Sequence, residues 1–237
     1  MNVLALETGS EWCSVAVGDG TQWVVRELHA GQTHSERVLP MIDAVLAQAG
    51  IALRDLGGIA FGAGPGGFTG VRIACGVAQG LAFGADIPVV PISTLAALCE
   101  IARRVHGWTR VLAALDARMG EVYVAAHRFE ADVWREAMPA AVLPPSAVAP
   151  PTPREGATNR ARWFAAGSGF AAYPEIGAAH KFAGIDAALR PDALAIGMLA
   201  LPVLRAGGGV AAALALPLYV RDRVALTTAE RAAGLRL

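Results

Sequence analysis

The feature that most constrains this chain is a loop at residues 62–70, which packs five glycines and a proline into nine positions: Gly62, Gly64, Pro65, Gly66, Gly67 and Gly70. It follows the apolar run Ile59–Phe61 and leads into a helix-like segment. Such a loop lets the backbone approach a phosphate, a neighbouring strand or another chain closely. Because no Gly-Lys-Ser/Thr follows, it is not a Walker loop, and we expect it to set the next helix tightly against the sheet.

Composition narrows the class of protein. Hydrophobic residues make up 54% of the 237 residues and charged residues 17%, which is enough for a sizeable core and too apolar for disorder. The formal net charge is +0, so no global field gathers nucleic acid. Three cysteines with no Cys-x-x-Cys predict a reducing, cytoplasmic setting. The first residues lack a signal peptide's basic start, and no membrane span is expected.

The order of elements predicts two lobes. Strands at 3–6, 12–17 and 22–28 precede a helix at 35–49, a strand at 59–62, a helix at 69–84, a strand at 89–92 and a helix at 93–105. A second α/β unit follows, with strands at 110–115, 121–126 and 163–166, a proline-rich connector at 144–153 and a helix at 191–201. We therefore expect an N-terminal lobe at 1–108, a C-terminal lobe at 109–216 and a tail at 217–237 that packs back.

This order is typical of the α/β class in its two-lobed, actin-like ATPase (ribonuclease-H-like) form with mixed sheets. The nearest rival is a doubly wound nucleotide-binding fold. That fold would not begin with consecutive hairpins, so the actin-like form is favoured.

Six short motifs follow one another along the chain: Glu7-Thr-Gly-Ser10, His34-Ser-Glu-Arg-Val-Leu-Pro40, Gly64-Pro-Gly-Gly-Phe-Thr-Gly-Val-Arg-Ile73, Pro91-Ile-Ser-Thr-Leu-Ala-Ala97, Asp116-Ala-Arg118 and Pro217-Leu-Tyr-Val-Arg221. Together they resemble the TsaB family, also called YeaZ, over nearly the whole chain. The Gly-Pro-Gly-x-Phe-Thr-Gly-x-Arg element is the most specific of them. The resemblance implies a non-catalytic subunit of the bacterial machinery that makes threonylcarbamoyladenosine on tRNA.

The resemblance also implies the partners. A TsaD-like transferase subunit and a TsaE-like ATPase are expected, with self-association as a homodimer in isolation and tRNA met only through the complex. The first two helices of the N-terminal lobe form the partner interface in this family. The interface residues carried over are His34, Val38, Met41, Ile42, Val45, Val71, Arg72, Cys75 and Gln79.

The residues argue separately against catalysis. A TsaD-like enzyme holds a metal with two histidines four apart on one helix, and no two of the five histidines here have that spacing. Glu7 stands where actin-like ATPases place an aspartate, and Gly9 removes a hydroxyl from the same loop. We expect no metal and no required cofactor. Weak ATP or ADP binding stays open, with Glu7, Thr8, Gly66, Gly67 and Thr69 as its candidate residues.

Three questions stay open at this point. The function alternative is a stand-alone actin-like ATPase or small-molecule kinase. For the first helix, Leu39, Ile42 and Leu46 are by default core, while Val38, Met41 and Val45 supply part of a second apolar face. On the second helix, Gly76, Gly80 and Gly84 form one stripe, which serves either packing within the lobe or an interface between chains.

Overall fold

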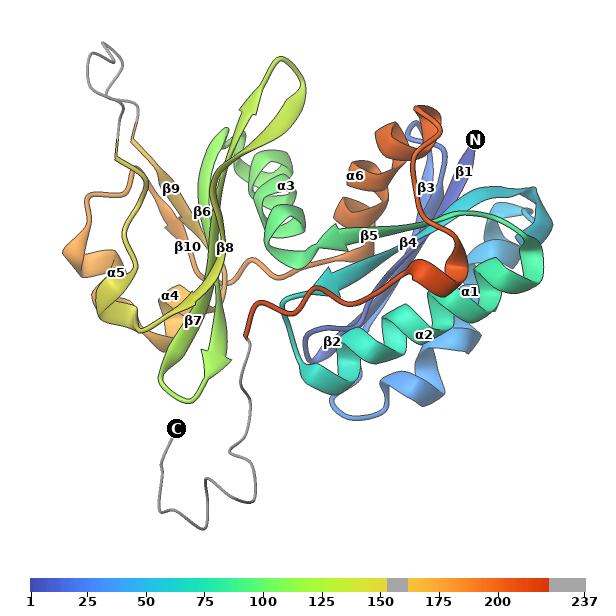
Figure 1. The fold of residues 1–237 in the computed structure, drawn as a ribbon, viewed down its shortest axis with the longest axis horizontal. Helices are drawn as coiled ribbons and strands as arrows, with labels where there is room; N and C mark the ends of the chain where they lie inside the picture. The colour runs from blue at the N-terminus through green and yellow to red at the C-terminus, as the bar shows by residue number, and fades with distance from the viewer. Residues whose placement is uncertain (153–161, 222–237) are drawn as a thin grey trace.

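Two five-stranded mixed sheets, one in each lobe, carry the fold (Figure 1). The computed structural model describes residues 1–152 and 162–221. The first sheet has the order β3-β2-β1-β4-β5. Its strands are β1 (Asn2–Glu7), β2 (Trp12–Gly18), β3 (Trp23–His29), β4 (Leu56–Gly64) and β5 (Val89–Ser93). The first three strands form an antiparallel meander, and β4 and β5 add in parallel beside β1.

The second sheet repeats the pattern of the first. Its strands are β6 (Arg110–Arg118), β7 (Glu121–Glu130), β8 (Val133–Leu143), β9 (Phe164–Ala166) and β10 (Ile185–Asp186), in the order β10-β9-β6-β7-β8. Again three strands form an antiparallel meander and two short ones add in parallel beside the first. Both sheets therefore match the mixed-sheet, two-lobed architecture that the order of elements predicts.

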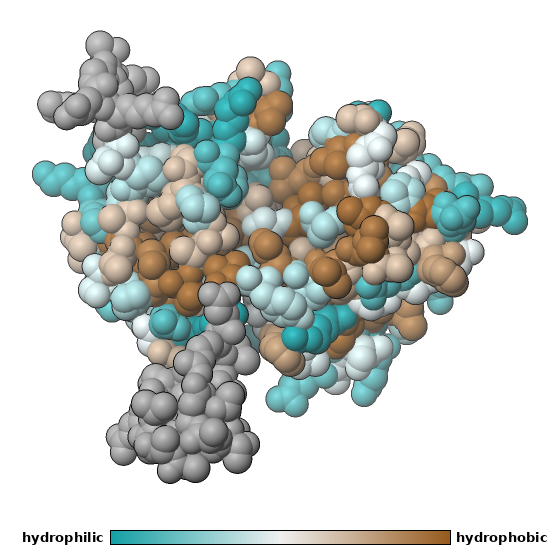
Figure 2. All heavy atoms as spheres, in the orientation of Figure 1, coloured by the Kyte–Doolittle hydropathy of each residue, from teal (hydrophilic) through white to brown (hydrophobic). Residues whose placement is uncertain are grey.

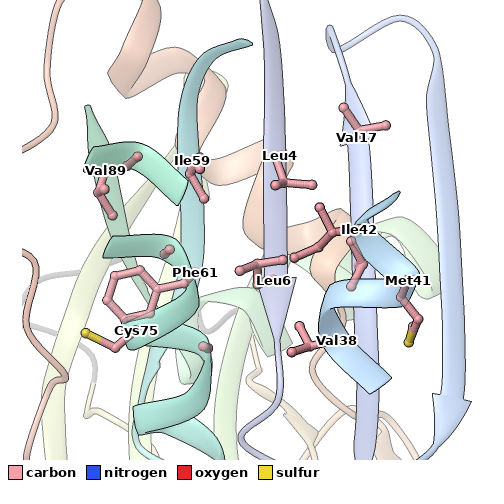
Figure 3. Packing of buried hydrophobic residues seen from close by; sticks show 14 of the residues in the cluster. Leu4, Leu6, Val17, Val38, Met41, Ile42, Ile59, Phe61, Cys75 and Val89 are labelled. Atoms are coloured by element: carbon pink, nitrogen blue, oxygen red, sulfur yellow. The ribbon is translucent and has the colours of Figure 1, made fainter. Parts of the chain in front are cut away.

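Helices cover both faces of the first sheet. The helices are α1 (His34–Ala49), α2 (Phe68–Ala85), α3 (Thr94–His106), α4 (Gly169–Ala172), α5 (Pro174–Ala179) and α6 (Ala193–Arg205), with single 3-10 turns at Leu53–Asp55, Pro145–Ala147 and Ala212–Leu214. Buried side chains of α1 and α2 meet Leu4, Leu6, Ile59 and Phe61 on one face (Figure 3). α6 packs on the opposite face, and α3 lies between the two sheets (Figure 1).

The predicted boundary of the second lobe is wrong for α6. This helix falls within the predicted range 109–216, yet Ile196, Ala200 and Leu204 are buried against β1, β2 and β4 of the first lobe. The Ser14 hydroxyl accepts a hydrogen bond from the Ala193 amide at 3.0 Å, and the Asp192 side chain caps the helix. Sequence order alone could not reveal this return, because the contacts join residues about 180 positions apart.

The chain that follows α6 stays on the first lobe before it crosses to the second. Val210 forms a bridge with Val89, and the Leu218 amide donates to the Ala63 carbonyl at 2.7 Å. Arg221 then reaches Ala117 and Glu121. Residues 217–221 thus contact both lobes, and the rest of the predicted tail, 222–237, lies outside the described residues.

α2 is unusual in composition. Among the described residues it is the one helix long and apolar enough, by length and composition alone, to cross a membrane. Here Ala74, Cys75, Ala78 and Ala82 pack in the first core, so the helix is an integral layer of the lobe. Arg72 is its single charged residue.

Candidate functional site

A cleft of about 1460 Å³ separates the two lobes. The end of β1 and the glycine loop form one wall, the β6–β7 turn forms the other, and the segment Leu218–Arg221 crosses the opening. Four of the five candidate nucleotide residues, Thr8, Gly66, Gly67 and Thr69, line this cleft. The structure thus brings them together, while their role in binding nucleotide stays a prediction.

The glycine loop packs against the residues that follow β1. A Cβ on Gly70 would lie 1.9 Å from the Thr8 carbonyl oxygen, and one on Gly66 would lie 2.7 Å from the Gly9 carbonyl oxygen. The Gly67 amide donates to that same Gly9 carbonyl at 2.7 Å. Glycine is required here because backbone meets backbone. This is the tight setting of helix on sheet that the sequence predicts.

Glu7, the fifth candidate, does not reach the cleft. It is 1% exposed and is absent from the cleft lining. Its Oε1 accepts a hydrogen bond from the Gly9 amide at 2.5 Å, and Oε2 has no partner among the described residues. Burial raises the pKa of Glu7 to about 7, because the charged form loses its hydration. The structure therefore does not bring Glu7 together with the other four candidates, and its contact with a nucleotide stays a prediction.

Asp116 and Arg190, two other charged groups of the cleft, are each held in an ion pair. Asp116 accepts a hydrogen bond from the Arg118 amide at 2.8 Å and forms an ion pair with the Arg118 guanidinium at 3.2 Å. Arg190 lies over the Trp12 ring at 3.9 Å from its centroid and pairs with Glu27. Sequence reasoning missed Arg190, since its partners lie more than 160 positions away. Within residues 1–152 and 162–221, no three His, Cys, Asp or Glu side chains gather as metal ligands do.

Most of the predicted partner-binding residues are in the core. His34, Val38, Met41, Ile42, Val45, Val71 and Cys75 are each 7% exposed or less. On α1 the buried positions 38, 41, 42, 45 and 46 form a single stripe that faces the sheet, and Leu39 is 48% exposed. The expected second apolar face is therefore the core face itself, and Leu39 is outside it. Five of the seven, Val38, Met41, Ile42, Val45 and Cys75, belong to the core cluster of the first lobe, while His34 and Val71 line the cleft.

Two predicted interface residues remain at the surface. Arg72 is exposed and stacks over the rings of Phe68 and Tyr219, at 3.3 and 4.9 Å from their centroids. Gln79 is half-buried and donates to the Ala215 carbonyl at 2.8 Å. Most of the predicted interface side chains therefore face the interior of the lobe, and other residues form its outer surface at α2.

The outward side of α2 consists of glycines and aromatic rings. A Cβ added at Gly76, Gly80 or Gly84 would meet no atom within 4 Å, so this stripe faces open space and does not serve packing within the lobe. Phe83 is 81% exposed and Phe68 60%. Beside α2, Leu214 and Leu216 are 69% and 67% exposed. Figure 2 shows apolar patches on the face of the molecule that carries these elements.

Comparisons with known proteins identify the family. The sequence profile of the TsaD family, described as tRNA N6-adenosine threonylcarbamoyltransferase, matches residues 26–228. The tRNA threonylcarbamoyladenosine biosynthesis protein TsaB of Escherichia coli is 40% identical, with 95% of this chain and 96% of that protein covered. This chain belongs to the TsaB (YeaZ) family. The TsaB of Haemophilus influenzae is also 40% identical, over 94% of this chain and 95% of its own length.

Solved structures of the TsaB (YeaZ) family confirm the fold. YeaZ from Pseudomonas aeruginosa superposes with a TM-score of 0.85 at 42% identity and covers 92% of this chain and 99% of its own. Another Pseudomonas aeruginosa structure, with the same TM-score and identity, is described as a protein similar to peptidase YEAZ and covers 93% of this chain and 99% of its own. The predicted actin-like α/β fold with two mixed sheets is confirmed.

The described residues contain one cysteine–histidine contact, and its properties do not support a peptidase activity. Cys99 Sγ lies 3.7 Å from His127 Nδ1, and Cys99 is fully buried. Burial raises the pKa of the Cys99 thiol and lowers that of His127 to about 4. A nucleophilic pair needs a thiolate beside an imidazolium, and both shifts favour the neutral forms.

Proposed function

We propose that this protein takes part in making threonylcarbamoyladenosine on tRNA, as a non-catalytic subunit that binds and supports a TsaD-like transferase. The biosynthetic pathway is inferred from the names of its relatives, which are tRNA threonylcarbamoyladenosine biosynthesis proteins. The single observation that carries the partner role is the outward side of α2. A helix face with one charge, an open glycine stripe and an 81% exposed phenylalanine is costly in water unless another chain covers it.

The chemistry of that face indicates what covers it. Glycines at every fourth position let a second helix come close, and flanking aromatic rings supply apolar area around the contact. We propose that a helix of the transferase subunit lies along α2 and that the exposed side of α1, with Leu39, adds to the same contact. In isolation, the protein pairs with itself through this face.

Three features support the absence of catalysis. Glu7 is buried, and Asp116 forms an ion pair with Arg118. Among the described residues, no three His, Cys, Asp or Glu side chains lie together as metal ligands would. We propose that no cofactor is required, that ATP or ADP binds weakly at most in the cleft, and that a TsaE-like ATPase and tRNA join through the complex. A cytoplasmic location follows from that role.

The experiment is co-purification of the full chain with the TsaD-like transferase of the same cell. Phe83→Asp places a charge on the outward side of α2 and is expected to weaken association at least about tenfold. Val105→Asp is the matched control, because Val105 is 58% exposed on α3, and it should bind like the wild type. Both variants should keep the wild-type circular dichroism. Equal binding by Phe83→Asp and wild type would overturn the interface.

Catalysis is tested separately. The isolated chain should hydrolyse ATP at no more than the rate of a buffer blank. Turnover that Asp116→Ala abolishes would instead support the stand-alone ATPase or kinase.

A further inference from the structure

Three arginines stand side by side on neighbouring strands of the second sheet. Arg110 on β6 lies directly opposite Arg128 on β7, and Arg128 lies directly opposite Arg135 on β8. Directly opposed residues of antiparallel strands point to the same face. We call these three residues the arginine row.

The arginine row lies on the face of the sheet that carries Leu112, Val124 and Ala126, where β6 begins and where β7 turns into β8. Arg135 is exposed, Arg110 is half-buried, and the Arg128 side chain is 38% exposed. Figure 2 shows hydrophilic side chains over the upper part of β8. The row is therefore accessible from solvent.

Like charges placed in this way repel each other. Adjacent strands are about 4.8 Å apart, so the three backbone positions span about 10 Å. That spacing is comparable to the screening length of about 8 Å at physiological salt, and like charges directly opposite each other destabilise a sheet. The arginine row therefore lowers the stability of the folded protein unless an anion neutralises its charge.

The described residues supply little neutralisation. The contact that compensates the row is Arg128 Nη1 with Glu130 Oε1, at 3.6 Å. Arg128 Nε is buried and has no acceptor within residues 1–152 and 162–221. Guanidinium groups in a line offer forked donors to successive phosphates, which is the geometry that a nucleic-acid backbone requires.

We propose that the arginine row binds the phosphate backbone of tRNA. The inference rests on the proposed function, which brings tRNA to the complex, and it places part of the tRNA contact on the second lobe of this chain, away from α2. The row contributes charge contacts to phosphates and carries no base specificity.

The test is fluorescence anisotropy of an unmodified tRNA transcript, titrated with the complex of this protein and its transferase partner and, in parallel, with this chain alone. The variant replaces all three residues: Arg110→Gln, Arg128→Gln and Arg135→Gln. The control removes three exposed or half-exposed first-lobe charges: Arg26→Gln, Arg54→Gln and Arg205→Gln. Each phosphate contact adds about 0.7 to 0.9 to the salt dependence of affinity.

The row variant should bind tRNA at least about tenfold more weakly, with the slope of log affinity against log salt reduced by about 2 to 3, and the control should not. Its melting temperature should equal or exceed that of wild type, because repulsion is relieved. Equal tRNA affinity of the row and control variants in both titrations overturns the proposal, as does equal competition by polyglutamate, which would indicate an acidic protein. Failure of the wild type to bind the transferase contradicts the proposed function instead, and the titration of the chain alone still decides the row.

Discussion

The Thr8 hydroxyl donates a hydrogen bond to the Gly70 carbonyl at 2.7 Å, and so ties the residue that follows β1 to the first turn of α2. The two backbones meet at this point, since a Cβ on Gly70 would lie 1.9 Å from the Thr8 carbonyl oxygen. The position of α2, and with it the outward face proposed for the partner, depends on this contact.

Gly70→Ala should therefore destabilise the protein by about 2 to 3 kcal/mol, because the obstructing atom belongs to the backbone and cannot rotate away. Gly76→Ala is the matched control on the same helix. Its Cβ meets no atom within 4 Å, so it should stabilise the isolated chain by about 0.5 to 1 kcal/mol through helix propensity. Urea unfolding followed by circular dichroism measures both. Equal stability of the two variants would contradict this account of the loop.

The elements of the fold differ in how far the sequence predicts them. Hydrophobic periodicity and turn residues predict α1, α2, α3 and the first meander, because these depend on local pattern. β8 was missed: Val133–Leu143 contains charges and Pro139, and its strand form depends on pairing with β7. The two sheets share one strand order without a sequence repeat, so the likeness of the lobes is visible only in the structure.

The candidate interface shows a second limit. A period of 3.6 residues identifies an apolar stripe on a helix but not the neighbour that covers it. On α1 the stripe that includes Val38, Ile42 and Val45 is covered by the protein's own sheet. On α2 the sequence shows the stripe Gly76, Gly80 and Gly84 but not whether the lobe itself covers it, and in the structure this stripe faces open space. Val71 of α2 is likewise covered by the protein itself, since it is 5% exposed, and a charge placed there would disturb the fold.

Stability should fall as pH rises through the range in which Glu7 ionises. Burial raises the pKa of Glu7 from 4.5 to about 7, so between these values the folded state binds more protons than the unfolded state. Stability is then fully present below about pH 4.5 and declines up to pH 7, by on the order of 3 kcal/mol. Glu7→Gln should remove this decline and be the more stable protein at pH 8.

Thermal unfolding of the two proteins between pH 5 and pH 8 measures the effect. Asp192 also lies near Glu7 and is present in both proteins, so the difference between their pH profiles reports the Glu7 carboxyl together with its charge interaction with Asp192. Parallel profiles for Glu7→Gln and wild type would show that Glu7 is ionised and solvated in solution.

Arg221→Ala should loosen the segment that crosses the cleft. Its guanidinium donates to the Ala117 carbonyl at 3.1 Å and to Glu121 Oε2 at 2.6 Å, while Leu218 three residues earlier is bonded to Ala63 in the first lobe. Because Glu121 is partly exposed, the loss should be only about 1 kcal/mol. Hydrogen exchange at the Leu218 amide should become faster. Arg205→Ala, which removes a contact to Asp19 within the first lobe, should leave that amide unchanged.

The three cysteines should be unreactive in the folded protein. Cys13, Cys75 and Cys99 are each 5% exposed or less, and burial raises the pKa of all three thiols, so little thiolate is present or accessible at neutral pH. A thiol reagent such as dithionitrobenzoate should titrate all three only after denaturation. His127→Ala should not change the rate in the native state, since His127 is held neutral beside Cys99 and activates nothing. Rapid, stoichiometric labelling of native Cys99 that depends on His127 would show instead that His127 activates the Cys99 thiol as a nucleophile. That result would support a peptidase activity for this protein.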